Sequence, residues 1–252
     1  MLAQIFIQNR SFHFFKPLLL VSGQTPINAV FNLHNFWDGR ASYRFNGRNP
    51  FGDADPNARV LEVLSGDNPT KVHISLEFAS LASQAVGPAL SDFEMSGAGR
   101  TFPKLGKKML SLRPLGLQSV HPDDSALGPY ALLGGKGLST TYSDLIKAAF
   151  QDKWWNSTKT VDGDLNLIAS PAGGTNEFSI MEANFSLYWG LAILCYESTL
   201  VSDDAPYDRF AEGNTDAMTP QQQLGLQMFM FDPVTKTGAN CIACHANAEF
   251  TG

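Results

Sequence analysis

The clearest pattern of apolar and polar positions lies in residues 179–201, where large apolar side chains recur at near-helical spacing. The residues that carry this pattern are Met181, Phe185, Leu187, Leu191, Leu194 and Leu200. Its most apolar part runs for only eleven residues and is flanked by Glu182 and Glu197. Because a helix needs about 20 apolar residues to cross a bilayer, we predict a buried helix over 179–201 and no membrane span.

Weaker patterns predict further helices at 58–64 and 142–150. Near the C-terminus, Thr219 is a suitable N-cap and Pro220 a suitable first residue of a helix. An apolar face follows, made of Leu224, Leu226, Met228, Phe229 and Phe231. We expect Met228 and its neighbour Met230 to pack in a core.

Other stretches predict irregular structure. Residues 96–141 are rich in Gly and Pro and have no regular period, so we predict a long ordered loop region there. Loops of this length in a compact domain are usually functional or wrap a ligand. The polar segment 202–206 marks a domain boundary near 203–218.

Composition and charge disfavour a nucleic-acid-binding protein, and the N-terminal sequence does not match a signal peptide. The chain has 252 residues, of which 17% are charged, and a net charge of −6. A negative net charge disfavours binding to nucleic acid. Arg10 and Lys16 precede a short apolar stretch at 17–21, but it lacks the length and the Ala-x-Ala site of a signal peptide.

The strongest chemical signal is Cys241-Ile242-Ala243-Cys244-His245, which has the C-x-x-C-H spacing of a c-type haem attachment site. Two thiols on one turn add to the porphyrin vinyl groups, and the histidine that follows binds the iron. A zinc site or a redox dithiol is the alternative, since C-x-x-C is also zinc-ligand spacing. Zinc would need two more ligands, and outside the motif no Cys or His follows Cys195. We expect Cys195 to be a buried apolar residue, and Met228 and Met230 not to be iron ligands.

The remaining candidate residues are weak signals by themselves. Trp37-Asp38-Gly39-Arg40 predicts an aromatic residue on a tight turn with a local ion pair. Gln84 and Glu94 are ordinary polar residues, the first on a helix and the second in a loop.

Taken together, however, several motifs resemble the bacterial dihaem cytochrome c peroxidase and MauG family. They are Phe36-Trp37-Asp38-Gly39-Arg40-Ala41, Gln84-Ala85 with Glu94-Met95, Thr199-Leu200-Val201 with Tyr207-Asp208-Arg209-Phe210, and Gly225-Leu226-Gln227-Met228-Phe229 before the cysteine motif. They occur in the family order from about residue 20 onwards. The stretch 42–78 and the region 113–124 are similar to the longer members of the family.

The resemblance implies a mainly α fold with long irregular loops and two cytochrome c-like domains, each with one covalent haem c. Residues 1–202 would then be a partial N-terminal peroxidatic domain, 203–218 a linker, and 219–252 the start of the C-terminal domain. Cys241, Cys244 and His245 would hold the haem through which electrons enter.

The resemblance also implies roles for three residues of the N-terminal domain. Trp37 matches a tryptophan between the haems, a candidate electron relay. Gln84 and Glu94 match the pair that lines the peroxide pocket. Glu94 would take a proton from bound peroxide and return it to the leaving oxygen, while Gln84 would orient that oxygen.

The sequence departs from the family in ways that predict a fragment. No C-x-x-C-H motif precedes Trp37, where the peroxide-binding haem should be attached. The Met or Tyr that would distinguish peroxidases from MauG-like enzymes would lie beyond Gly252, as would most ligands of an interdomain calcium ion. We therefore expect an N-terminal haem segment and most of the C-terminal domain to be missing, and this chain alone to be no competent peroxidase. His13, His34, His73 and His121 are expected to be surface or structural residues.

The function implied is the reduction of hydrogen peroxide to water, with electrons from a small cytochrome c or cupredoxin. Attachment of haem c requires export, so the parent protein should be periplasmic; a homodimer is left open. Two alternatives remain: a monohaem electron-transfer protein, and a MauG-like oxidase that acts on a partner protein.

Overall fold

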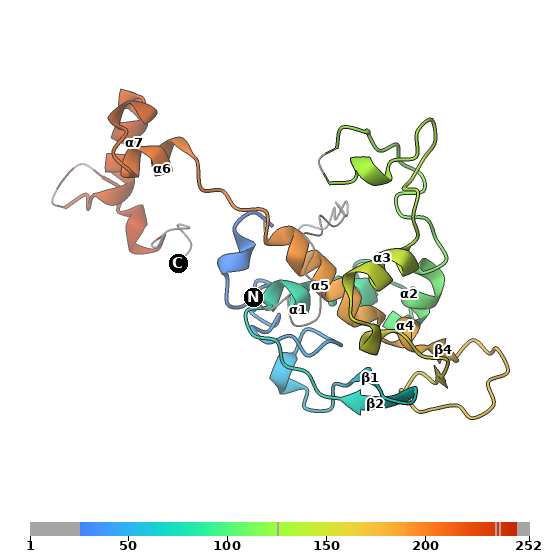
Figure 1. Cartoon of the computed structure of the whole chain (residues 1–252). Helices are drawn as coiled ribbons and strands as arrows, with labels where there is room; N and C mark the ends of the chain where they lie inside the picture. Colours follow the sequence, from blue (N-terminus) through green and yellow to red (C-terminus); the bar gives the residue numbers. More distant parts are fainter. Residues whose placement is uncertain (1–25, 125, 235, 237, 246–252) are drawn as a thin grey trace. The chain divides into compact units, whose positions relative to one another are not determined.

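The computed structural model describes residues 26–124, 126–234, 236 and 238–245. The chain divides into two units between Leu200 and Val201 (Figure 1), and each is described by itself. His13 and the signal-like stretch at 10–21 lie outside the described residues. No helix in the described part of the chain has the length and apolar character that a membrane crossing requires.

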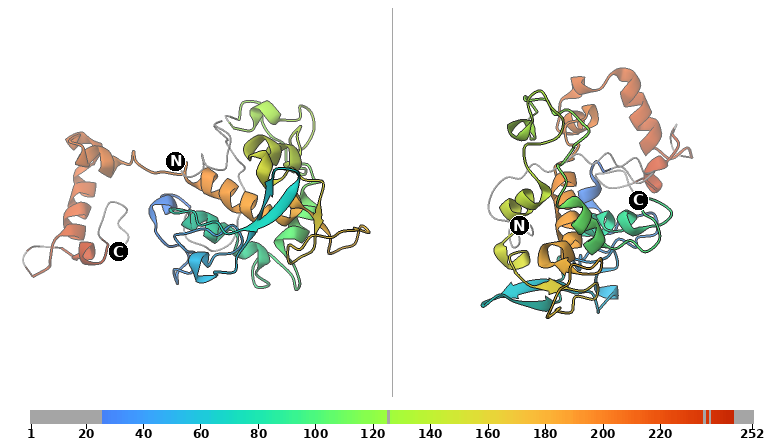
Figure 2. Two further views of the ribbon diagram at one scale, coloured as in Figure 1. Left: turned by 60° about the horizontal axis from the view of Figure 1, so that its bottom comes forward. Right: turned by 90° about the vertical axis from the view of Figure 1, so that its right-hand side faces the viewer.

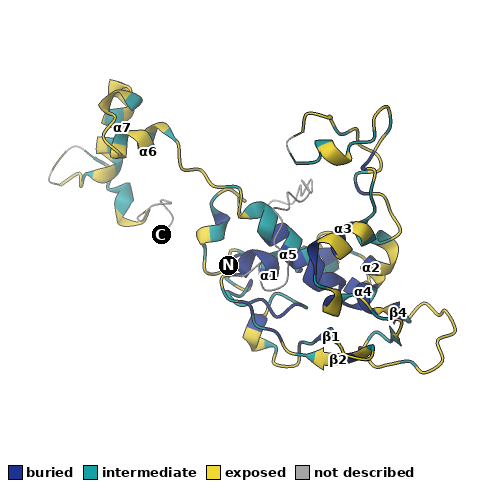
Figure 3. Ribbon diagram, in the orientation of Figure 1, coloured by how far each residue is buried: buried dark blue, intermediate teal, exposed yellow. Residues whose placement is uncertain are grey.

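The first unit is built around helix α5 (Phe185–Glu197), which packs against α1 (Ser80–Ala85) and α2 (Phe102–Met109). Figure 2 shows α1 beside α5 in both views, and Figure 3 shows that most of the length of α5 is buried. Gly190 allows the close approach of α5 to α1, because a Cβ there would lie 3.1 Å from the carbonyl oxygen of Ala82 in α1 and 2.7 Å from Cζ of the buried Phe45. The main core gathers around this contact and includes Phe45, Leu81, Phe102, Ile146, Phe150, Trp154, Leu187, Tyr188 and Leu191.

The long helix predicted over 179–201 is two helices, α4 (Ile180–Ala183) and α5, separated at Asn184. Ser179 caps α4 through a capping box with Glu182. The buried Asn184 side chain accepts a hydrogen bond from the amide of Leu61 at 2.9 Å and donates to the carbonyls of Leu61 at 2.7 Å and Trp154 at 2.8 Å. We attribute the break between α4 and α5 to these hydrogen bonds, which join the side-chain amide of Asn184 to the backbone of two other segments.

The helix predicted at 58–64 is wrong: Val60–Leu64 forms strand β1, paired antiparallel with β2 (Asn68–Val72). Gly66 and Asp67 turn the hairpin with φ of 78° and 55°. A Val-Leu-Glu-Val-Leu segment suits either element, and pairing with β2 decides in favour of the strand. A second antiparallel pair joins β3 (Thr160–Val161) and β4 (Phe178–Ser179).

The predicted loop region 96–141 contains helix α2, so the prediction is wrong for that part. Thr101 caps α2 by accepting a hydrogen bond from the amide of Lys104, and Pro103 lies in its first turn. The rest of the region, as far as it is described, is irregular apart from a short 3-10 turn at Gly128–Tyr130 and an isolated β-bridge between Ala131 and Leu138. The helix predicted at 142–150 is confirmed as α3 (Tyr142–Ala149).

The second unit contains α6 (Pro206–Ala211) and α7 (Pro220–Met230). The predicted start of α7 is confirmed, with Thr219 capping the helix and Pro220 as its first residue. None of the described residues from 201 onwards is buried. Met228 is 45% exposed and Met230 is 42% exposed. The prediction that they pack in a core is therefore wrong for the described structure, in which no residue of the second unit is buried. The predicted linker 203–218 contains α6 and a 3-10 turn, and its role as a domain boundary stays a prediction.

Candidate functional site

The turn that carries Trp37 is closed at its base by two backbone hydrogen bonds between Asn35 and Ala41, each 3.2 Å. Phe36 and Gly39 both have a left-handed backbone, with φ of 65° and 69°. Trp37 lies at the tip and is 89% exposed. The predicted tight turn is therefore confirmed.

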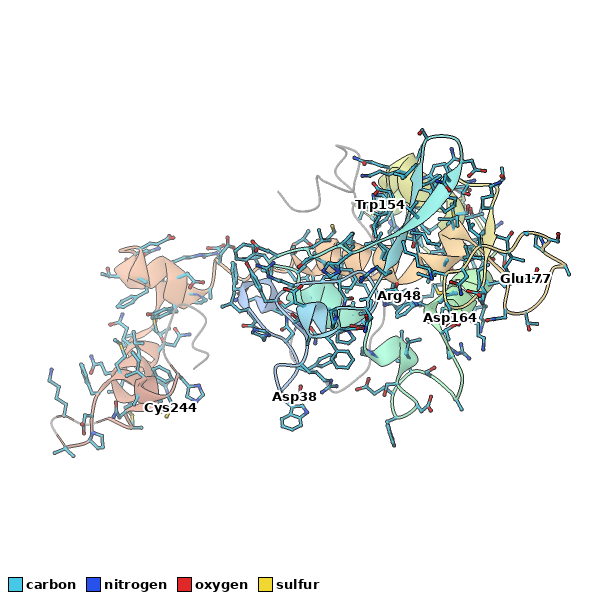
Figure 4. All side chains as sticks on the ribbon, turned by 90° about the horizontal axis from the view of Figure 1, so that it is seen from below. Asp38, Arg48, Trp154, Asp164, Glu177 and Cys244 are labelled. Carbon is cyan, nitrogen blue, oxygen red and sulfur yellow. The ribbon has the colours of Figure 1, made fainter. Side chains whose placement is uncertain are left out.

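The predicted ion pair of this turn is confirmed as well. Arg40 Nη1 lies 2.9 Å from Asp38 Oδ2, and the hydrogen bond from Arg40 lowers the pKa of the Asp38 carboxyl (Figure 4). The Arg40 guanidinium also lies over the Phe36 ring, 4.1 Å from its centroid. Arg40 therefore stabilises the turn from the solvent side, although an exposed pair of this kind contributes little free energy.

Gln84 lies in the last turn of α1, as predicted, and is half-buried. Its carbonyl accepts a hydrogen bond from the amide of Gly87 at 3.0 Å, which ends the helix. On the next residue, the carbonyl of Ala85 accepts a hydrogen bond from Trp189 Nε1 at 2.9 Å. Trp189 belongs to α5, so the end of α1 is fixed to the central helix.

Glu94 lies in an irregular segment after a 3-10 turn at Pro88–Leu90. Its amide donates to the carbonyl of Ser91 at 3.1 Å. Glu94 is exposed, Phe93 beside it is fully exposed, and Met95 is 46% exposed. The structure thus places Gln84 at an end of α1 that is fixed to the central helix, whereas Glu94 faces solvent in the described residues.

The Cys241-x-x-Cys244-His245 motif forms one tight turn. Cys241–Ala243 is a 3-10 helix that begins after Asn240, whose φ is 53°. The Cys241 carbonyl accepts hydrogen bonds from the amides of Cys244 at 3.1 Å and His245 at 2.9 Å. Both thiols are free; Cys241 is half-buried, and Cys244, labelled in Figure 4, is exposed.

Helix α7 holds this turn through its backbone. The amide of Ala239 donates to the carbonyl of Met228 at 2.6 Å, and that of Asn240 donates to Phe231 at 2.9 Å. Gly238 makes the approach feasible, because a Cβ there would lie 2.0 Å from the Phe231 carbonyl oxygen. The Phe229 ring lies 6.5 Å from the His245 ring, so an aromatic residue flanks the imidazole.

This donor set fits haem c: two thiols and an imidazole lie within one turn, and apolar side chains of the neighbouring helix are uncovered. In the described residues, no group of three or more His, Cys, Asp or Glu side chains is placed to hold a metal ion. The described residues therefore supply no second pair of ligands that would complete a zinc site with Cys241 and Cys244.

Cys195 is expected from the sequence to be a buried apolar residue, and the histidines outside the motif are expected to be surface or structural residues. Cys195 is half-buried rather than fully buried, and burial raises the pKa of its thiol. His34, His73 and His121 are exposed, which confirms them as surface residues.

Two residues near the site were missed in the sequence. Asn35 is fully buried in the Trp37 turn, and its Nδ2 donates to Ser80 Oγ in α1 at 2.9 Å. No local pattern marks either residue, because 45 positions separate the two partners.

Two curated proteins are similar to this chain over a short region. One is cytochrome c551 peroxidase of Pseudomonas aeruginosa, 39% identical over 62 residues, which are 25% of this chain and 16% of that protein. The other is the methylamine utilization protein MauG of Methylophilus methylotrophus, 37% identical over 60 residues, 24% of this chain and 17% of that protein. No family model and no solved structure matches the chain.

The matched segments span only about a sixth of the curated relatives' length. The similarity supports the family resemblance loosely, over a quarter of the chain. It does not bear on the truncation that the sequence analysis expects.

Proposed function

We propose that this chain belongs to a haem-dependent oxidoreductase of the dihaem peroxidase and MauG type. The observation that carries the proposal is the Cys241-x-x-Cys244-His245 turn, which α7 holds through the backbone of Met228 and Phe231. The partial similarity to a cytochrome c peroxidase and to MauG supports it. In this proposal the fold is mainly α, with a cytochrome c-like domain begun in each unit.

Cys241 and Cys244 would hold a haem c by thioether bonds, and His245 would bind its iron. The group supplies reversible one-electron transfer when it is bound. The two backbone hydrogen bonds from the motif to the Cys241 carbonyl keep the thiols and the imidazole on one turn. The exposed side chains of Leu224 and Met228 on α7 would then gain an apolar partner.

The finer part of the proposal is the reduction of hydrogen peroxide to water in the first unit. Glu94 would accept one proton of peroxide and return it to the leaving oxygen. Gln84 would donate a hydrogen bond to the bound oxygen, and Trp37 would relay electrons from the C-terminal haem. Two electrons and two protons are consumed per peroxide, and a small periplasmic redox protein would supply the electrons.

The exposure of Trp37 and Glu94 sets a condition on this proposal. A general acid and base works best where bulk water is excluded, whereas both residues face solvent in the described structure. In this proposal, the second haem of the parent protein and its neighbouring segments would cover both residues.

A single C-x-x-C-H motif in the chain favours one alternative, a monohaem electron-transfer protein. The two functions differ in whether Glu94 takes part in turnover. A MauG-like oxidation of a partner protein would use the same first unit.

Haem attachment tests the proposal. The full chain, fused behind an export signal peptide, is expressed in a host that matures c-type cytochromes, and haem that stays bound after denaturation is measured from its pyridine haemochrome spectrum. We expect covalent haem in the native sequence and its loss in the variant in which Cys241→Ala and Cys244→Ala are combined. Cys195→Ala is the matched control, because it removes the third thiol and should leave attachment unchanged.

His245→Ala tests the iron ligand separately. It should keep covalently bound haem but change its absorption spectrum, because the proximal ligand is lost. Absence of covalent haem in the native sequence, or its retention without both motif thiols, would refute the proposal.

A further inference from the structure

A buried polar link connects the Trp37 turn to helix α1. Asn35 is fully buried, and its Nδ2 donates to Ser80 Oγ at 2.9 Å. The Ser80 hydroxyl in turn donates to the carbonyl of Asn32 at 2.8 Å, so the link returns to the segment that leads into the turn. Asn35 also makes both backbone hydrogen bonds that close the turn on Ala41.

The turn that this link holds is strained. Phe36, directly after Asn35, has a φ of 65°, which is a costly conformation for a bulky side chain. Its ring packs so closely on the end of α1 that a Cβ on Gly87 would lie 3.2 Å from the ring edge. Such a backbone persists only when the surrounding contacts determine it, and here they include the Asn35–Ser80 bond and the Phe36–Gly87 packing.

Trp37 depends on this backbone for its position. Its side chain is 89% exposed and so has little packing of its own in the described structure. Ser80 is in the first turn of α1, and Gln84 lies one turn further along the same helix. A rigid link at Ser80 therefore sets the place of Trp37 with respect to Gln84.

We propose that Asn35 is a positioning residue, which acts through Ser80 to hold the strained Trp37 turn in one place relative to Gln84. The functional meaning of this placement rests on the proposed function, in which Trp37 relays electrons and Gln84 binds the oxygen. The mechanical part does not depend on haem or peroxide.

Amide hydrogen exchange in the full chain, followed by NMR, tests the mechanical part. The reporters are the amides of Gly39 and Ala41, which are bonded to the carbonyls of Phe36 and Asn35. Asn35→Ala should speed their exchange by about tenfold or more, because the buried hydrogen bond to the Ser80 hydroxyl is lost. Ser80→Ala should have a similar effect, and the double variant should add little to either single one, because both break the same link.

Ser186→Ala is the matched control. Ser186 is fully buried in α5 and its hydroxyl donates to the carbonyl of Gly47 at 2.6 Å, so the variant loses a buried side-chain hydrogen bond that involves no residue of the 35–41 turn or of α1. It should leave the exchange of Gly39 and Ala41 close to that of the native chain. Equal exchange in Asn35→Ala and Ser186→Ala, or fully additive effects of the two link variants, would overturn the proposal.

A kinetic measurement on the peroxide-active parent protein adds the functional part. Asn35→Ala should lower kcat and leave KM for peroxide nearly unchanged, because Asn35 places the relay and does not contact peroxide. A raised KM with unchanged kcat would contradict the positioning role. If the parent protein turns over no peroxide at all, the proposed function fails, and the exchange experiment still decides on the link.

Discussion

Replacement of Asn184 by alanine should be among the most destabilising single changes in the first unit. The native side chain is 1% exposed and makes three hydrogen bonds, two to the backbone of Leu61 and one to the carbonyl of Trp154. The Trp154 carbonyl keeps a second donor, the Tyr188 hydroxyl at 2.5 Å. The amide and carbonyl of Leu61 would both lose the Asn184 partner inside the protein.

The magnitude follows from these two groups. A buried polar group left without a partner costs about 1–3 kcal/mol, so the loss of a partner by both groups in Asn184→Ala should lower the free energy of unfolding by about 2–6 kcal/mol. That is a large share of the roughly 5–15 kcal/mol that holds a typical domain together. We expect a marked fall in the urea midpoint with little change in the slope.

Tryptophan fluorescence during urea unfolding measures this effect without interference from the second unit. All four tryptophans, Trp37, Trp154, Trp155 and Trp189, precede residue 201. Asn57→Ala is the control, because Asn57 is an exposed asparagine and the change should be close to neutral. A loss below about 1 kcal/mol for Asn184→Ala would show that water or a shifted backbone replaces the side chain, and would refute the reasoning.

Two further predictions concern carboxylates. Burial raises the pKa of Glu197 to about 7 from its ordinary value of 4.5, so the folded protein holds its proton where the unfolded chain has lost it. The free energy of unfolding should therefore fall as the pH rises from about 4.5 to 7 and level off above that range. Urea unfolding at several pH values should show a smaller fall for Glu197→Gln than for the native chain. An identical fall in both would contradict the raised pKa of Glu197. In the haem-loaded parent protein, Glu94→Gln should abolish most peroxide turnover and leave haem reduction by the electron donor unchanged, as measured by stopped-flow absorbance; unchanged turnover would favour the electron-carrier alternative.

The parts of the fold that were predictable from sequence are those with local causes. The start of α7 follows from Thr219 and Pro220, whose capping and φ preferences act within one turn. The turn at 36–40 follows from Asp38-Gly39 in the same way. The cysteine motif is recognisable because attachment of a haem c requires this spacing of two thiols and a histidine.

The parts that failed depend on distant partners. Val60–Leu64 is a strand because β2 pairs with it, and its own side chains suit a helix almost as well. Helix α2 was hidden by the Gly and Pro around it, although Thr101 and Pro103 were a readable start signal. The link between Asn35 and Ser80 joins residues 45 positions apart, and the exposure of Glu94 depends on what packs over it, so neither could be read from local pattern.

The bond between Asn184 and Leu61 also has a consequence for synthesis on the ribosome. The two residues are 123 positions apart. At about 5–20 residues per second, translation separates their emergence by about 6–25 seconds. During that interval the amide and the carbonyl of Leu61 in β1 lack their native partner, Asn184. The nascent N-terminal half therefore passes through a period in which a chaperone has an exposed strand edge to bind.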